Sequence, residues 1–187
     1  MKKLLMITIV LSLFLSSCSN YQPEQANARV EGYLAQLKSL PVTASHPHAE
    51  QQFLTMFGDF KQAASKADII RNVYADSFYF NDTFKTFNSL DDLVEYMQKT
   101  AEQVTVTRVA LLDVAKSDSD YYLRWVMDMV FMAKGREVKS KSIGMTQLRF
   151  DQEGKIILHQ DFWDGGEGFY QHLPFVDYIV NKIQSGL

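Results

Sequence analysis

The stretch between residues 105 and 163 constrains the fold of this chain more than any other, because strand-like segments follow one another in it without a helical break. Each segment is rich in β-branched and aromatic residues, and short turn-like segments with Gly, Asp or Ser separate them. Short connections between long strands require antiparallel neighbours. The expected strands are Thr105–Lys116, Tyr121–Ala133, Glu137–Asp151 and Lys155–Trp163. The sequence therefore predicts an antiparallel meander.

Helical patterns come before and after this meander. Apolar residues recur at helical spacing there, and Ser89 is a suitable N-cap for the helix that directly precedes the meander. A short aromatic strand, Ser77–Asn81, comes before that helix. The expected helices are Ala28–Leu40, a second one ending near Ala64, Ala67–Ala75, one from Leu90 to about Gln103, and Pro174–Ile183. Segregated helices and strands predict an α+β fold with helices packed on one sheet face.

Cys18 is the only cysteine, and it ends the run Leu15–Cys18 behind a short apolar stretch that begins with two lysines. This arrangement resembles the lipobox of bacterial lipoproteins. The resemblance implies that residues 1–17 are a signal peptide and that an acylated Cys18 anchors the domain at a membrane. Because Ser19 rather than aspartate follows the cysteine, the resemblance to Gram-negative lipoproteins implies the outer membrane. An ordinary secretory signal is the alternative.

The rest of the chain is expected to divide into a tether, a helical segment and one domain. Residues 18–27 are polar and predict a lipidated tether, residues 28–47 an N-terminal helix and loop, and residues 48–187 the domain. The formal net charge of −3 and the lack of a basic stripe argue against a nucleic acid partner. With Cys18 acylated no thiol remains, which excludes disulfides and cysteine-ligated metal.

Two blocks of residues carry a resemblance to a known family. The first is Tyr74–Asp82, followed by Leu90–Leu93, and the second is Leu148–Ile156, followed by Asp161–Asp164. With the order of elements between them, these blocks resemble the nuclear transport factor 2-like superfamily, and within it the SnoaL-like polyketide cyclases and ketosteroid isomerases. The resemblance implies a single α+β domain in which helices wrap a curved antiparallel sheet into a cone with an apolar pocket. Members include enzymes and non-catalytic binding modules, so the fold does not settle the function.

Asp82 is the first candidate catalytic residue. In ketosteroid isomerases an aspartate at the matching position, after the short strand, is the general base. A carboxylate beside an apolar pocket has its pKa raised by desolvation, which suits a base that works near neutral pH. The alternative is a turn residue, because Asn-Asp after a strand is common in turns.

The same resemblance exposes a departure from those isomerases, which stabilise their oxyanion with a tyrosine and a protonated aspartic acid. Thr146 stands at the place of the acid, and the helix expected to carry the tyrosine has Phe53, Phe57 and Phe60 instead. Loss of both donors would leave a dienolate without stabilisation. Steroid isomerase activity is therefore not expected.

His159, Asp161 and Trp163 form a second candidate site. Alternate residues of a strand share a face, so these three are expected to point the same way, and by resemblance toward the pocket. His159 and Asp161 are then close enough to interact and to act as acid and base. The alternative is a pair of polar contacts at a sheet edge or dimer interface. The other alternate set, which is expected to cover the opposite face, is Ile156, Leu158 and Phe162.

The pocket wall is expected to be aromatic and rich in methionine. Trp125 and Met127 belong to an apolar face of one predicted strand, which indicates core together with pocket wall. The expected ligand pocket residues are Tyr79, Trp125, Met127, Thr146 and Trp163. His46 and His48 could chelate a metal, but no third ligand occurs at a recognisable spacing, so neither metal nor cofactor is expected.

Three functions remain open on the sequence alone. The first is an envelope lipoprotein that binds a small apolar ligand without catalysis. The second is a pocket enzyme, of isomerase, cyclase or hydrolase type, that uses Asp82 or the pair His159 and Asp161. The third is a dimeric scaffold or accessory subunit of an envelope assembly. The expected partners are accordingly a membrane through the lipid, a small molecule, and a second copy through the sheet face.

Overall fold

The computed structural model of the protein describes residues 23–41, 48–133, 135–173 and 176–186. The chain divides into two units, with the boundary between Ser39 and Leu40. In the first unit the described part is one helix, α2 (Pro23–Ser39), which begins five residues earlier than predicted and ends before Pro41. Cys18 and His46, two residues singled out by the sequence, lie outside the described residues.

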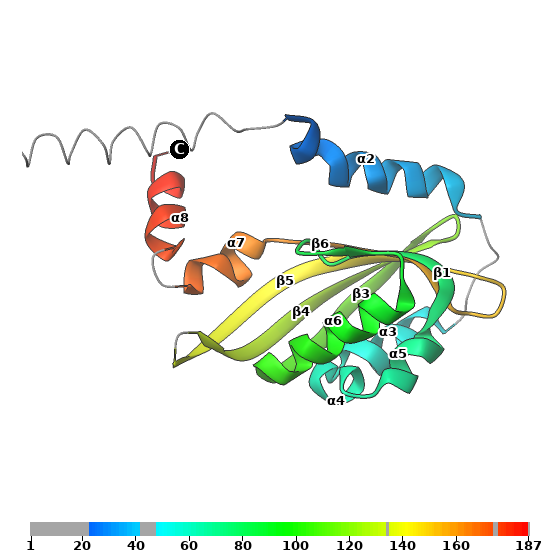
Figure 1. Ribbon diagram of the computed structural model, residues 1–187, viewed down its shortest axis with the longest axis horizontal. Coiled ribbons are helices and arrows are strands. Elements are labelled where there is room, and N and C mark those ends of the chain that lie inside the picture. The colour runs from blue at the N-terminus through cyan, green and yellow to red at the C-terminus, as the bar shows by residue number, and fades with distance from the viewer. Residues whose placement is uncertain (1–22, 42–47, 134, 174–175, 187) are drawn as a thin grey trace, which may run out of the picture. The chain divides into compact units, whose positions relative to one another are not determined.

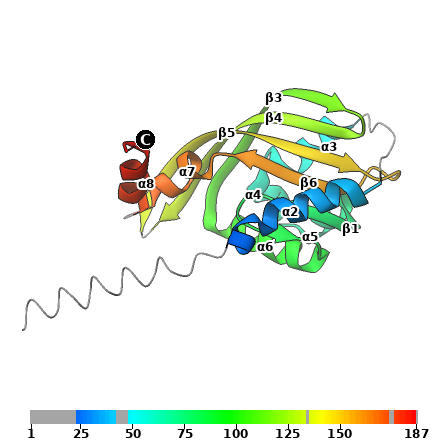
Figure 2. The same ribbon diagram turned by 90° about the horizontal axis from the view of Figure 1, so that it is seen from above.

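The second unit is built on one six-stranded sheet (Figures 1 and 2), whose order is β2-β1-β6-β5-β4-β3. The strands are β1 (Tyr74–Asn81), β2 (Thr86–Phe87), β3 (Val104–Ser117), β4 (Asp120–Ala133), β5 (Arg136–Phe150) and β6 (Ile156–Trp163). Strands β3 to β6 form the predicted antiparallel meander, and their ends agree with the prediction to within one residue. The sheet is mixed, because β1 pairs in parallel with β6.

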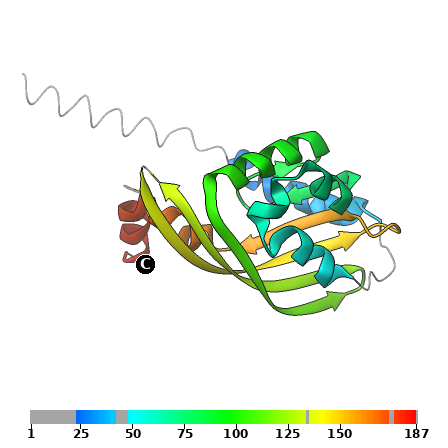
Figure 3. The same cartoon turned by 90° about the horizontal axis from the view of Figure 1, so that it is seen from below.

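Helices cover one face of this sheet (Figure 3). The helices of the unit are α3 (Ala49–Phe57), α4 (Phe60–Ala64), α5 (Ala67–Val73), α6 (Leu90–Gln103), α7 (Gly165–Gly168) and α8 (Val176–Gln184), with a 3-10 turn, η2 (Tyr170–His172). Helix α6 begins as predicted, since the Ser89 hydroxyl accepts the amide proton of Asp92. Its apolar stripe, with Leu93 and Met97, is buried against the sheet together with Phe53 and Met56 of α3.

Three local predictions differ from the structure. The expected helix ending at Ala64 is two helices, because the Asp59 side chain caps a new helix by accepting the amide proton of Gln62. Helix α5 ends at Val73 rather than Ala75, so β1 begins at Tyr74, three residues earlier than predicted. The two-residue strand β2 is too short to leave a periodic pattern in the sequence.

Irregularities in strand pairing bend the sheet and change which residues share a face. The pairing of β5 with β6 shifts where Arg149 lies opposite Leu158 and Phe150 lies opposite Ile156. Such a bulge adds one residue and inverts the alternation beyond it. The prediction that Ile156 shares a face with Leu158 and Phe162 is therefore wrong, because Ile156 packs into the core under the helices.

Candidate functional site

A cavity of about 640 Å³ lies between the sheet and the helices on its covered face. Its wall is mostly aromatic and sulfur-containing, with contributions from α3, β4, β6 and the segment after β6. Representative wall residues are Phe57, Phe60, Trp125, Met127, Met129, Phe131, Trp163 and Phe169. A cavity of this size and lining is typical of a site for a small, largely apolar molecule.

Rings from the C-terminal segment pack against one another beside this cavity. Phe84 makes edge contacts with Trp163, Phe169 and Tyr170, at centroid distances of 5.3, 5.2 and 5.9 Å. Phe169 also stacks on Phe131 of β4, at 5.3 Å. These contacts place α7 and η2 next to the cavity, and the side chains that they contribute were not predicted as pocket residues.

Asp82 lies in the turn after β1 and also lines the cavity. Its Oδ1 accepts the amide protons of Phe84 at 3.0 Å and Lys85 at 2.8 Å, as a turn aspartate does. Its Oδ2 accepts the hydroxyl proton of Tyr96 from α6, at 2.5 Å. Asp82 is therefore a turn residue through its Oδ1, and a pocket residue whose Oδ2 is bonded to Tyr96.

Burial raises the pKa of the Asp82 carboxyl above its ordinary value, and the negative charge of Asp161 adds to this effect. The hydrogen bonds from Tyr96 and from the backbone of Lys85 and Phe84 act in the opposite direction. The pKa of Tyr96 is also raised, first by burial and then by the charge of Asp82, so Tyr96 keeps its proton and donates it. The outcome is a carboxyl that keeps its proton to a higher pH than a solvated one.

Asp161 of β6 is the second carboxylate on the cavity wall. Its Oδ1 accepts two hydrogen bonds, one from the Thr146 hydroxyl at 2.5 Å and one with Nε2 of His159 at 3.0 Å. Thr146 in turn accepts the indole proton of Trp125 at 2.8 Å. Asp161 is thus held in place by β5 and β4, while none of the described residues donates a hydrogen bond to its Oδ2.

His159 lies behind Asp161 and does not line the cavity. Its side chain is fully buried, with the rings of Phe80 and Phe57 at 4.7 and 5.3 Å. Nδ1 is 2.9 Å from the hydroxyl of Tyr74, whose pKa is raised by burial and by the charges of Asp161 and Asp82. The tautomer with its proton on Nε2 satisfies both contacts, because Tyr74 donates to Nδ1 and Nε2 donates to Asp161. In this arrangement the imidazole positions Asp161 from behind.

The structure brings most of the predicted site residues together. Asp82, Asp161, Trp125, Met127, Thr146 and Trp163 all line the cavity. The prediction of Tyr79 as a pocket residue is wrong. Alternation along β1 places Phe80 in the cavity wall, while the Tyr79 hydroxyl bonds to Gln160 at 3.4 Å and to Asn81 at 3.2 Å.

Tyr96 is the functional residue that the sequence reasoning missed. It stands on the apolar stripe of α6, where helical spacing indicates only a packing position. No sequence spacing marked it, because its contact with Asp82 depends on how α6 packs over the turn after β1. The helices that carry Phe53, Phe57 and Phe60 contribute no tyrosine to the cavity, and the tyrosine that contacts Asp82 comes from α6.

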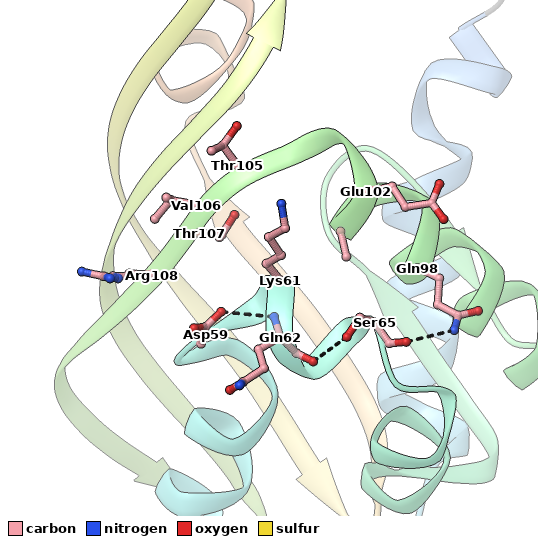
Figure 4. A pocket seen from close by; sticks show the side chains of 11 residues that line it. Asp59, Lys61, Gln62, Ser65, Gln98, Glu102, Thr105, Val106, Thr107 and Arg108 are labelled. Carbon is pink, nitrogen blue, oxygen red and sulfur yellow. Dashed lines mark hydrogen bonds between the residues drawn. The ribbon is translucent and has the colours of Figure 1, made fainter.

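A second hollow, of about 690 Å³, lies where α4, α6 and β3 meet (Figure 4). Its polar groups are used in local structure rather than directed at a common point. Lys61 donates to the carbonyl of Val104 at 2.7 Å, Ser65 donates to the carbonyl of Gln62 at 2.8 Å, and Asp59 caps α4. We therefore assign the functional site to the cavity with the two carboxylates.

The described part of the chain contains no group of three or more His, Cys, Asp or Glu side chains placed to hold a metal ion. None of the helices within residues 23–41, 48–133, 135–173 and 176–186 is both long and apolar enough to cross a membrane.

Comparison with known proteins identifies the family of the chain. The sequence model of the SnoaL-like domain family matches residues 51–159, which is more than half of the chain. This range runs from within α3 through α6 and includes the sheet as far as His159. A search of curated proteins found no match.

Solved structures with the same fold are distant in sequence. A hypothetical protein with a ketosteroid isomerase-like fold from Catenulispora acidiphila, solved in complex with trimethylamine, is 15% identical with a TM-score of 0.58, over 70% of this chain and 96% of that chain. An LEH-like epoxide hydrolase of M. tuberculosis is 13% identical with a TM-score of 0.52, over 72% of this chain and 94% of that chain. At these identities the likeness concerns the fold and assigns no ligand or reaction to this chain.

Proposed function

The chain belongs to the SnoaL-like domain family, and on that premise we propose that it binds a small, largely apolar molecule in the cavity beneath α6, while a lipid on Cys18 holds it at a bacterial membrane. The observation that carries the binding proposal is the cavity wall. Aromatic and methionine side chains enclose about 640 Å³, and polar groups are gathered around Asp82 and Asp161. Apolar walls provide affinity, and a few placed polar groups provide orientation.

The membrane part of the proposal rests on the N-terminal sequence. A short apolar segment ends at Cys18 behind two lysines, as in lipoprotein signal peptides. An acylated cysteine gains about 0.8 kcal/mol for each methylene buried in the bilayer. Together these features support an anchored binding protein of the cell envelope, with the outer membrane as the favoured location.

Native mass spectrometry of the full-length protein, purified from membranes of a Gram-negative host, tests both parts at once. We expect a chain that begins at Cys18, carries the mass of acyl groups, and retains a small molecule without a covalent bond. A chain that still begins at Met1 would contradict the anchor. A ligand that is too polar for the aromatic wall would contradict the cavity as its site.

A pair of variants on one strand locates the bound molecule. Met127 lines the cavity, whereas Val126 lies opposite Ala110 and Ile143 on the other face of the sheet. Met127→Trp should fill the cavity and abolish retention of the ligand, and Val126→Trp should leave it unchanged. Retention by Met127→Trp would place the ligand elsewhere.

Acid–base catalysis in the same cavity is a second candidate, favoured by the pair Asp82 and Tyr96. The buried carboxyl with its raised pKa could accept a proton from a bound substrate, and Tyr96 keeps a hydrogen bond on the carboxylate. The fold relatives include an epoxide hydrolase, so the fold accommodates chemistry. The candidate requires that the pKa of Asp82 in the folded protein lies above its unfolded value.

Asp82→Asn tests that requirement without knowledge of a substrate. Because the folded pKa is raised, the folded wild type binds more protons than the unfolded chain between the two pKa values and loses stability as the pH rises through the folded pKa. As the pH rises from about 4 through the folded pKa, we expect the free energy of unfolding of Asp82→Asn to increase relative to that of wild type. The expected increase is about 1.4 kcal/mol for each unit that separates the folded and unfolded pKa values. Urea denaturation across this range measures the difference.

The controls for this measurement use Tyr96 and an exposed carboxylate. Tyr96→Phe removes a hydrogen bond that lowers the pKa of Asp82, so the loss of stability caused by deprotonation of Asp82 should move to higher pH. Asp128→Asn removes one charge on the opposite face and should lack the trend. If the free energy of unfolding of Asp82→Asn instead fell relative to wild type as the pH rose, the pKa of Asp82 would be lowered and the catalytic candidate would fail.

A further inference from the structure

The charges around the cavity are unbalanced. Asp82 and Asp161 both line it, and no Lys, Arg or His side chain from the described residues does so. No residue in the described part of the chain donates to Oδ2 of Asp161, and Oδ2 of Asp82 accepts one hydrogen bond, from the Tyr96 hydroxyl. Carboxylates in an apolar enclosure are unfavourable unless a positive charge or several hydrogen bonds compensate them.

The indole N–H groups of the two tryptophans that line the cavity are both used within the protein. Nε1 of Trp125 donates to Thr146, the residue that holds Asp161. Nε1 of Trp163 donates to the carbonyl of Asp82 at 3.1 Å. Since each indole N–H is already used, the remaining attraction of each tryptophan for a ligand is through its π face, which favours cations.

A third polar group in the cavity has no partner. The Thr107 hydroxyl on β3 has no hydrogen bond, although the residue is only 5% exposed. Unsatisfied buried hydroxyls are uncommon, and this one borders both the cavity and the hollow where α4, α6 and β3 meet. It could therefore donate to an occupant of either space.

We propose that the ligand is an organic cation, an amine or quaternary ammonium with apolar substituents, whose charge lies between Asp82, Asp161 and the rings of Trp125 and Trp163. The inference rests on the proposed function, because it names the chemical class of the molecule in the same cavity. A cation supplies the charge that the cavity lacks, and its substituents contact the aromatic and methionine wall. An anion would be repelled by two carboxylates, and a neutral molecule would add no positive charge to their existing hydrogen bonds.

A pair of probes with matching shape separates charge from hydrophobicity. Benzyltrimethylammonium and its carbon analogue neopentylbenzene differ in the charge at one atom. The chain has two tryptophans, and both line the cavity, so intrinsic fluorescence reports occupancy. With full-length protein in phosphatidylcholine nanodiscs, and empty nanodiscs as the blank, we expect the ammonium to bind at least about tenfold more tightly than the hydrocarbon.

Two carboxylate variants test the assignment of the charge. Asp161→Asn keeps an acceptor for Thr146 and His159, and Asp82→Asn keeps one for the turn amides. Each should weaken ammonium binding about tenfold and leave hydrocarbon binding within about twofold. Asp128→Asn, exposed on the opposite sheet face, removes the same charge and should change neither. The wild-type ratio remains decisive if one variant fails to fold.

The outcomes separate this inference from the proposed function. Equal affinities, or tighter hydrocarbon binding, would overturn the cationic ligand and leave an apolar ligand in place. A preference for the ammonium that survives both Asn variants would also overturn the inference, because the charge would then lie elsewhere. Binding of neither probe would count against both proposals.

Discussion

His159→Leu should lower the free energy of unfolding by about 2–4 kcal/mol, although leucine is apolar and similar in volume to histidine. The reason is the buried chain of hydrogen bonds in which the imidazole is the central member. Tyr74 loses the acceptor of its hydroxyl in a site without solvent access, and Asp161 loses one donor. A buried donor left without a partner costs more than the hydrogen bond itself contributed. Urea denaturation of the full-length protein measures the change.

A double-mutant cycle tests whether the unpaired Tyr74 hydroxyl causes the loss of stability in His159→Leu. Tyr74→Phe removes the hydroxyl, so the combination of Tyr74→Phe with His159→Leu should cost less than the sum of the single changes, by about 1–2 kcal/mol. His172→Leu, at a partly exposed position in η2, is the matched control and should change stability by less than about 0.5 kcal/mol. Additive costs would show that Tyr74 and His159 do not act as a unit.

The fold of the second unit was predictable because its strongest signals are local. Long alternating strands joined by short turns fix an antiparallel meander, and the turns contain the residues that their backbone requires. Gly135 and Gly154 have φ values of 78° and 82°, in the region that favours glycine. The parallel pairing of β1 with β6 was not predictable from pattern, because the segments that it joins are far apart in sequence and no turn records their direction.

The site was predictable in its carboxylates and less so in its surroundings. Alternation along one strand placed Asp161 and Trp163 on the cavity side, and the family resemblance singled out Asp82. The error at Tyr79 came from three consecutive aromatic residues, Phe78, Tyr79 and Phe80, which do not mark which face of the strand lines the cavity. Tyr96 was missed because its function depends on the distance between a helix and a turn, which no sequence spacing expresses.

Gly144→Ala should cost about 1–3 kcal/mol of stability and reduce ligand affinity, although Gly144 is not a lining residue of the cavity. In the register of the sheet Gly144 lies directly between Trp125 of β4 and Trp163 of β6. A Cβ built there would lie 2.4 Å from the Trp125 ring and 2.8 Å from Cβ of Trp163. Neither neighbour can move cheaply, because Trp125 is bonded to Thr146 and Trp163 to the carbonyl of Asp82.

The expected displacement has a direct spectroscopic measure. Both tryptophans of the chain flank this glycine, so near-ultraviolet circular dichroism should change in Gly144→Ala. Gly165→Ala is the matched control, since its new Cβ would meet no atom closer than 3.6 Å. An unchanged spectrum and unchanged stability of Gly144→Ala would mean that the strands separate to admit the methyl group.

The consequence for the site follows from the order of contacts outward from Gly144. Displacement of the Trp125 ring breaks the hydrogen bond to Thr146, and Thr146 is one of the two groups that hold Asp161. Displacement of Trp163 releases the carbonyl in the turn that contains Asp82. A single methyl group on the middle strand should therefore loosen both carboxylates together, and ligand affinity should fall by more than the loss of either tryptophan contact alone would explain.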